Sequence, residues 1–193
     1  FDSFEHYYSL YQRRNLDLWA EYADGKVTKE ELNRQRYLYP LEAVGAGDST
    51  LAKAYERDAL TMIPTKSKLM PHAREVLEYL SRKYNLYILS NGFKELQSHK
   101  MRSSGIDEYF KKVVLSDDIG ILKPWPEIFH FALSTTQSEL NNSLMIGDSW
   151  ENDIVGAAGV GMHQVFYNLS GRIDLPFAPT YQITDLKDLF NFL

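Results

Sequence analysis

The sequence predicts an α/β protein with a parallel, Rossmann-like sheet flanked by helices, and with a separate segment made of helices alone. Two observations predict this fold class. Before about residue 65, apolar side chains such as Tyr7, Leu18 and Trp19 recur at helical spacing. After residue 65, short apolar runs alternate with helical segments, which is the order of βαβ units with right-handed crossovers. We therefore predict a helical domain over residues 1–65 and an α/β domain over residues 66–193.

The helical domain carries signals for where its helices begin and end. Thr28 followed by Glu31 is the pattern of a capping box, in which each side chain bonds a backbone N–H of the first turn. We expect that helix to end before Pro40, because proline has no N–H to donate. Residues 44–48 are expected to form a loop, after which Asp48 or Ser49 caps a helix that runs to about Ile63.

The α/β domain is expected to begin with a helix from Pro71 to about Tyr84. Strands are expected at the apolar runs 86–90, 113–116, 144–147, 165–167 and 181–183. Helices are expected at 93–103, which Gly105 ends, and at 126–135, 151–158 and 185–192.

The composition excludes several classes of protein. A net charge of −5 argues against sequence-independent binding to nucleic acid, which needs a basic face. The absence of cysteine excludes a disulfide scaffold, a thiolate metal site and a cysteine nucleophile, and it fits a reducing, cytoplasmic environment. No apolar run is long enough to span a bilayer, so we expect no membrane partner.

Two carboxylates follow the expected strand at 144–147. Asp148 lies at the tip of that strand, and Asp153 lies about one turn into the next helix. Because ligands of an open α/β sheet bind at the carboxyl ends of its strands, both oxygen donors are expected at the ligand-binding edge. Mg²⁺ prefers such donors. The alternative is that Asp148 and Ser149 only cap the helix.

Ser90, Asn91 and Gly92 end the expected strand at 86–90. A hydroxyl and successive backbone N–H groups at a strand-to-helix turn can cradle an anion, and glycine lets the backbone approach it closely. An ordinary turn rich in small polar residues is the alternative.

Lys123 follows an apolar pair and precedes Pro124 and Pro126, which stiffen the loop. A lysine held in this way can pair with phosphate and with carboxylates that would otherwise repel one another. The alternative is a solvated loop lysine.

Together, these three stretches resemble the haloacid dehalogenase superfamily, and within it the phosphatases with a helical cap domain, including a group similar to pyrimidine nucleotidases. Ser90 matches the family's second motif, Lys123 its third, and Asp148 and Asp153 its fourth, in the family's order. The resemblance runs from about residue 66 to the end of the chain. It also makes residues 1–65 similar to the cap domain that the family inserts between its first and second motifs.

The resemblance implies an enzyme that removes phosphate from a small phosphorylated metabolite, such as a nucleoside monophosphate, with Mg²⁺ as cofactor. It implies that Ser90 and the backbone of Asn91, next to Gly92, hold the phosphoryl oxygens. Lys123 would balance the charge of the phosphate and of the attacking carboxylate.

For the metal, the resemblance implies that Asp148 binds Mg²⁺. Asp153 would support the ion through water or orient Lys123. Ser149 and Asn152 would lie behind these residues and support them.

One motif of the family is not found. Its first motif, an Asp-x-Asp at the end of the central strand, has no match in residues 1–65. The resemblance makes its first aspartate the nucleophile and its second the general acid and base. We therefore expect a further N-terminal segment before Phe1, and we expect these 193 residues alone to be inactive, with the sheet lacking its middle strand.

Two other functions remain open at this point. A metal-independent haloacid dehalogenase shares the Leu-Ser-Asn-Gly stretch, but the paired Asp148 and Asp153 favour a phosphatase. A non-catalytic binding domain of the same fold would fit the missing nucleophile, although such a domain has no need of Lys123 and the two carboxylates.

Overall fold

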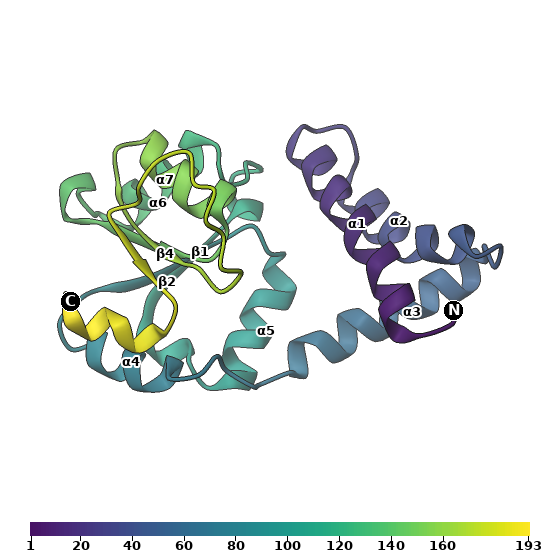
Figure 1. Ribbon diagram of the computed structural model, residues 1–193, viewed down its shortest axis with the longest axis horizontal. Coiled ribbons are helices and arrows are strands. Elements are labelled where there is room, and N and C mark those ends of the chain that lie inside the picture. The colour runs from purple at the N-terminus through teal and green to yellow at the C-terminus, as the bar shows by residue number, and fades with distance from the viewer. The chain divides into compact units, whose positions relative to one another are not determined.

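The computed structural model describes residues 1–193, and the chain divides into two compact units, Phe1–Thr65 and Lys66–Leu193. The first unit consists of α1 (Phe4–Ala23), α2 (Lys29–Ala43) and α3 (Ser49–Met62), followed by a 3₁₀ turn at Ile63–Thr65 (Figure 1). Buried residues of α2 and α3 form its core, with Tyr11 of α1 packed against them. The role of this unit as a cap domain stays a prediction.

Side-chain caps begin each helix of the first unit. Ser3, Thr28 and Asp48 accept hydrogen bonds from backbone N–H groups in the first turns of α1, α2 and α3. The other half of the expected capping box does not form, because the Glu31 carboxylate pairs with Arg34 instead.

The expected end of α2 before Pro40 is wrong, since the helix continues to Ala43 with Pro40 buried inside it. A proline in a helix costs about 3 kcal/mol through its missing hydrogen bond and its ring. Tyr37, Leu38 and Leu41 surround it and are all buried. Each contributes about 2 kcal/mol on burial, which outweighs that cost and carries the helix past the proline.

The second unit alternates strands and helices as the sequence predicts. Its elements are α4 (Ala73–Leu80), β1 (Leu86–Ser90), α5 (Lys94–Ser104), β2 (Phe110–Leu115), α6 (Pro126–Thr136), β3 (Leu144–Gly147), α7 (Gly156–Gly159), β4 (His163–Tyr167) and β5 (Tyr181–Ile183). Two expected α-helices differ in type. Residues 151–158 form a π-helical stretch, Trp150–Val155, followed by the short α7, and the last helix is a 3₁₀ helix at Leu186–Asn191.

The strands form two parallel sheets. One has the order β1-β2 and the other β3-β4-β5, so β1 and β3 each have a hydrogen-bonded neighbour on one side only. Every residue of β1 and of β3 is only half-buried, whereas the middle of β4 is fully buried. The exposure of β1 and β3 follows from their position at the edge of a sheet.

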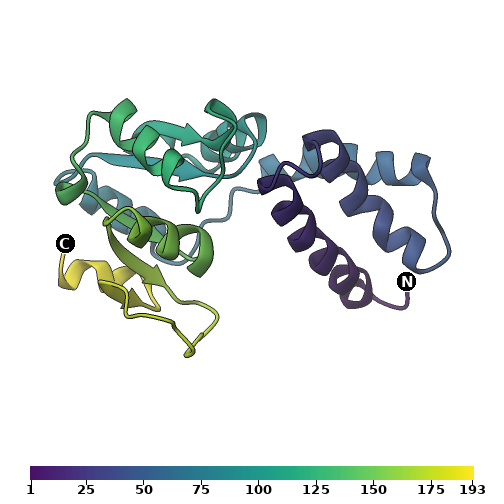
Figure 2. The same cartoon turned by 90° about the horizontal axis from the view of Figure 1, so that it is seen from above.

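Helices cover both faces of these strands (Figures 1 and 2). Val165 and Ile183 pack with α4 and the final 3₁₀ helix in one core cluster. A second cluster joins α6, through Ile128 and Phe129, to α7 through Ala157. This packing leaves the carboxyl ends of the strands at the edge where the predicted site residues lie. None of the helices combines the length and the apolar character needed to cross a membrane.

Candidate active site

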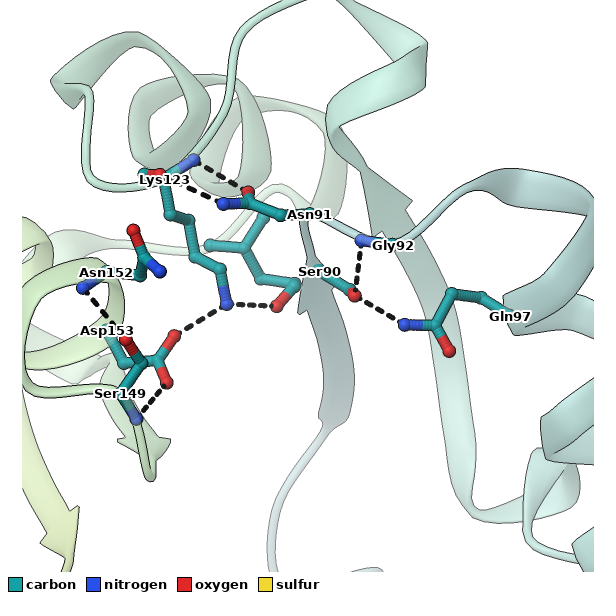
Figure 3. A network of polar contacts seen from close by, with 9 residues as sticks. Ser90, Asn91, Gly92, Gln97, Lys123, Ser149, Asn152 and Asp153 are labelled. Carbon is teal, nitrogen blue, oxygen red and sulfur yellow. Dashed lines mark hydrogen bonds and ion pairs between the residues drawn. The ribbon is translucent and has the colours of Figure 1, made fainter. Parts of the chain in front are cut away.

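The side chain of Lys123 links the ends of the two sheets. Lys123 lies in the loop before α6, and its Nζ donates to the carbonyl oxygen of Leu89 at 2.8 Å and to Oδ1 of Asp153 at 2.6 Å (Figure 3). Leu89 belongs to β1, whereas Asp153 follows β3. The structure therefore brings the second, third and fourth motifs together, although β1 and β3 do not pair.

Lys123 and Asp153 form a buried ion pair. Lys123 is 9% exposed and Asp153 is 4% exposed. Oδ2 of Asp153 also accepts the backbone N–H of Ser149 at 3.0 Å, so each carboxylate oxygen already has a donor. The resemblance implies that Asp153 either supports the metal ion through water or orients Lys123. The observed hydrogen bonds match the second role.

The carboxylate of Asp153 lies directly against Gly147 at the end of β3. A Cβ at Gly147 would stand 2.3 Å from Oδ2 and 2.4 Å from Cγ of Asp153, which is well inside contact distance. The last residue of β3 must therefore lack a side chain for the ion pair to form.

Asn91 holds the backbone of Lys123 with its side chain. Its Oδ1 accepts the Lys123 N–H at 2.7 Å, and its Nδ2 donates to the Lys123 carbonyl oxygen at 2.9 Å. The resemblance assigns only the backbone of Asn91 to the phosphoryl group. The structure adds a second task, which is to fix the loop that carries Lys123.

Ser90 is held from two sides. Its Oγ accepts the backbone N–H of Gly92 at 3.0 Å and the side-chain Nε2 of Gln97 at 2.6 Å (Figure 3). Gln97 comes from α5. It is not among the residues that the sequence predicts for the site, because a glutamine seven residues after a serine carries no recognisable pattern.

Asp148 differs from the other predicted site residues in being exposed, and it forms no hydrogen bond or ion pair. Ser149 caps the π-helical stretch by accepting the N–H of Asn152 at 3.2 Å. The alternative of simple helix capping therefore holds for Ser149 and not for Asp148.

The donors at this edge fit Mg²⁺ in number and kind. No group of three or more His, Asp or Glu side chains is gathered to hold a metal. Mg²⁺ needs fewer, since it is commonly bound through one or two carboxylates, waters and substrate phosphate. The exposed carboxylate of Asp148 is free to act as such a ligand.

The two tryptophans near these motifs have different environments. Trp125 is 51% exposed beside Lys123 in the chain, whereas Trp150 is 3% exposed and packs against Phe166 and Phe177. Trp150 is thus a core residue.

Two relatives are similar to this chain over most of its length. The HAD-hydrolase YfnB of Bacillus subtilis is 29% identical over 187 residues, which cover 95% of this chain and 78% of YfnB. Pyrimidine 5'-nucleotidase YjjG of Escherichia coli is 30% identical over 186 residues, which cover 95% of this chain and 80% of YjjG.

Solved structures share the fold. The magnesium-bound crystal structure of YfnB matches with a TM-score of 0.88 at 28% identity, over 97% of this chain and 82% of YfnB. A dehalogenase structure matches with a TM-score of 0.80 at 25% identity, over 98% of this chain and 84% of the other. A model of the haloacid dehalogenase-like hydrolases matches residues 2–161. With three motifs joined at the ends of β1 and β3 and with these matches, the chain belongs to the haloacid dehalogenase-like hydrolases.

Proposed function

We propose that this protein is a Mg²⁺-dependent phosphatase that removes the phosphate from a small phosphomonoester through an aspartyl-phosphate intermediate. The observation that carries the proposal is the buried Lys123–Asp153 pair, with Nζ–Oδ1 at 2.6 Å, beside the hydroxyl of Ser90 and the free carboxylate of Asp148. A fixed cation, a hydroxyl and a free carboxylate at one sheet edge suit a dianionic group and its metal ion.

The relatives support the substrate class. YjjG is named a pyrimidine 5'-nucleotidase, and a 29% identical relative from Thermus thermophilus is named a phosphoserine phosphatase. Both names describe release of phosphate from a small molecule. We therefore propose a small phosphorylated metabolite as the substrate, with nucleoside monophosphates as the first compounds to test.

The residues of the site have separate tasks in the proposed reaction. A carboxylate attacks the phosphorus, the ester P–O bond breaks, and the leaving oxygen takes a proton from a general acid. Ser90 and the backbone of Asn91 bind the phosphoryl oxygens, while the N–H of Gly92 holds the Ser90 hydroxyl. The ammonium of Lys123 offsets the charge of the phosphoryl group, and Asp153 keeps it in place.

When bound at Asp148, Mg²⁺ would add further positive charge at the phosphoryl group. Water then hydrolyses the aspartyl-phosphate and frees the carboxylate. As the family resemblance implies, we propose that the attacking carboxylate and the general acid come from residues upstream of Phe1. The single-sided pairing of β1 and β3 supports this, because a strand between them would bring its carboxyl end next to Lys123.

The proposal is tested with protein expressed from the complete reading frame of its gene and with residues 1–193 alone. We expect the former to release inorganic phosphate from nucleoside monophosphates, to lose activity with a chelator and to regain it with Mg²⁺. We expect the latter to release none. Activity that is indifferent to the chelator would contradict the metal requirement.

Dehalogenation is the second candidate, because the dehalogenase structure aligns with 98% of this chain. A haloacid dehalogenase needs no metal ion, so an exposed, unpaired carboxylate at Asp148 has no evident use in it. Release of halide from a 2-haloacid, unaffected by chelator and without release of phosphate from any ester, would favour this candidate over ours.

A further inference from the structure

The hydroxyl of Ser90 receives two hydrogen bonds at once. The N–H of Gly92 lies 3.0 Å from its Oγ, and Nε2 of Gln97 lies 2.6 Å from it. A serine hydroxyl has two acceptor positions and one hydrogen to donate. Both acceptor positions are taken, so the hydrogen is the part of this hydroxyl that is left to bind something else.

Gln97 reaches Ser90 through the space that a side chain at Gly92 would fill. A Cβ at Gly92 would lie 2.3 Å from Nε2 of Gln97 and 2.8 Å from its Cδ. The first turn of α5 thus folds a carboxamide back over the strand end, in contact with the backbone of Gly92 (Figure 3). The hydrogen bond from Gln97 to Ser90 therefore requires that residue 92 has no side chain.

We propose that Gln97 is a positioning residue that fixes the direction of the Ser90 hydroxyl, so that its hydrogen points to an acceptor oxygen of the bound phosphoryl group. The proposal rests on the phosphatase function proposed above. Phosphate oxygens are acceptors, and a hydroxyl already turned to donate needs no rearrangement when they arrive. A hydroxyl free to rotate would present a lone pair to the anion for part of the time.

A change of Gln97 to glutamate reverses the polarity of this contact. A carboxylate only accepts, so Ser90 would donate its hydrogen to the introduced carboxylate and turn a lone pair towards the phosphate. We expect Gln97→Glu to weaken the binding of inorganic phosphate and to lower kcat/KM by about 10²-fold, the loss typical of a removed oxyanion donor. Gln182→Glu is the matched control, because it adds the same charge at an exposed position of β5.

Two further changes remove the contact without adding charge. Gln97→Met keeps the length of the side chain but cannot hydrogen-bond. Gly92→Ala leaves Gln97 intact and displaces its carboxamide. In both variants the backbone N–H of residue 92 remains as a donor to Ser90, so the hydroxyl loses one of its two constraints and is not reversed. We therefore expect both to raise KM, with similar effects on kcat/KM that are smaller than the effect of Gln97→Glu, while circular dichroism stays that of the unchanged protein.

Nuclear magnetic resonance tests the hydrogen bond itself without any substrate. We expect the side-chain N–H signals of Gln97 to move to the range of solvent-exposed glutamines in Ser90→Ala. Unmoved signals would overturn the proposal, and so would a Gln97→Glu variant that binds phosphate and turns over substrate as the unchanged protein does. That second result would mean that phosphate binding does not depend on how Gln97 directs the Ser90 hydroxyl.

Failure of the proposed function looks different from failure of this inference. A protein that neither binds phosphate nor hydrolyses any phosphomonoester refutes the phosphatase function, and with it the phosphoryl group as the acceptor. The resonance experiment would then still report whether Gln97 donates to Ser90. Full phosphatase activity with a normal Gln97→Glu variant would leave the function standing and refute only the role of Gln97.

Discussion

The side chain of Asn91 forms two hydrogen bonds with the backbone of Lys123, accepting its N–H at 2.7 Å and donating to its carbonyl oxygen at 2.9 Å. This pair fastens the loop before α6 to the end of β1. The ammonium of Lys123 reaches across to Asp153 from that anchored backbone. The position of the charge at the site thus depends on a neutral residue 32 positions away in the sequence.

Asn91→Ala is expected to lower kcat without unfolding the protein. The loss of two hydrogen bonds costs about 2 kcal/mol of stability. The unanchored loop no longer holds the Lys123 ammonium in place, and small misplacements of this kind can cost about 10²-fold in rate. Steady-state kinetics on a phosphomonoester checks this, with Asn142→Ala as the control, since Asn142 is exposed and bonds only within its own turn. Equal kcat in both variants would refute the anchoring role.

Lys123→Met is expected to destabilise the protein as well as inactivate it. Removal of Lys123 leaves the carboxylate of Asp153, which is 4% exposed, without its counter-ion. A buried charge left alone costs about 3–5 kcal/mol. Urea unfolding of Lys123→Met, Asp153→Asn and the double variant measures this. We expect the double variant to be more stable than the sum of the two single changes predicts, whereas strict additivity would mean that the pair does not form in solution.

Gly147→Ala is expected to disrupt the ion pair from the side of β3. The added Cβ would lie 2.3 Å from Oδ2 of Asp153, so this carboxylate has to move away from Lys123. Gly159→Ala is a matched control, because a Cβ there meets nothing within 4 Å. We expect activity to fall about tenfold or more in the first variant, in line with a displaced charge at the reacting group, and to be unchanged in the second. Retained activity in Gly147→Ala would show that Asp153 is not needed at its observed place.

The first unit is expected to lose stability in alkali. Burial raises the pKa of Tyr7 from its ordinary value of 10.0 to about 12, and likewise the pKa of Tyr37 to about 12. Since both phenols ionise more readily in the unfolded chain, their contribution is complete below pH 10 and disappears as the pH rises to 12. Helical circular dichroism against pH measures this. Tyr7→Phe and Tyr37→Phe should each reduce the loss of helical signal between pH 10 and 12. A pH profile that does not change in these variants would mean that the phenols are solvated.

Local rules account for most of the elements that the sequence predicts. Hydrogen bonding explains the caps at Thr28 and Asp48. Backbone conformation explains the end of α5 at Gly105, which is left-handed, and the start of α6 at Pro126. The predicted helix end before Pro40 is wrong because tertiary burial of its neighbours overrides a local penalty. The π-helical stretch after Ser149 depends on packing of Trp150 and Ile154, which a sequence pattern does not reveal.

In the candidate site, too, the sequence predicts some features, whereas others depend on tertiary contacts. Strand ends predict where Ser90, Lys123 and Asp148 come together, because parallel strands share an edge. The sequence does not show that Asp148 and Asp153 have different roles. It depends on Asp153 lying against Gly147 beside the ammonium of Lys123, while Asp148 stays exposed. The sequence does not reveal Gln97 as a site residue, because its contact with Ser90 depends on Gly92 having no side chain.

The proposed phosphatase site is tested most directly by the Mg²⁺ dependence of phosphate release in Asp148→Asn, made in protein expressed from the complete reading frame. We expect this variant to fold normally, since the Asp148 side chain has no partner within the protein to lose. We also expect half-maximal activity to need at least about tenfold more Mg²⁺ than in the unchanged protein, or activity to be absent. An Asp148→Asn variant with the activity and the Mg²⁺ requirement of the unchanged protein would refute the assignment of Asp148 as the metal ligand.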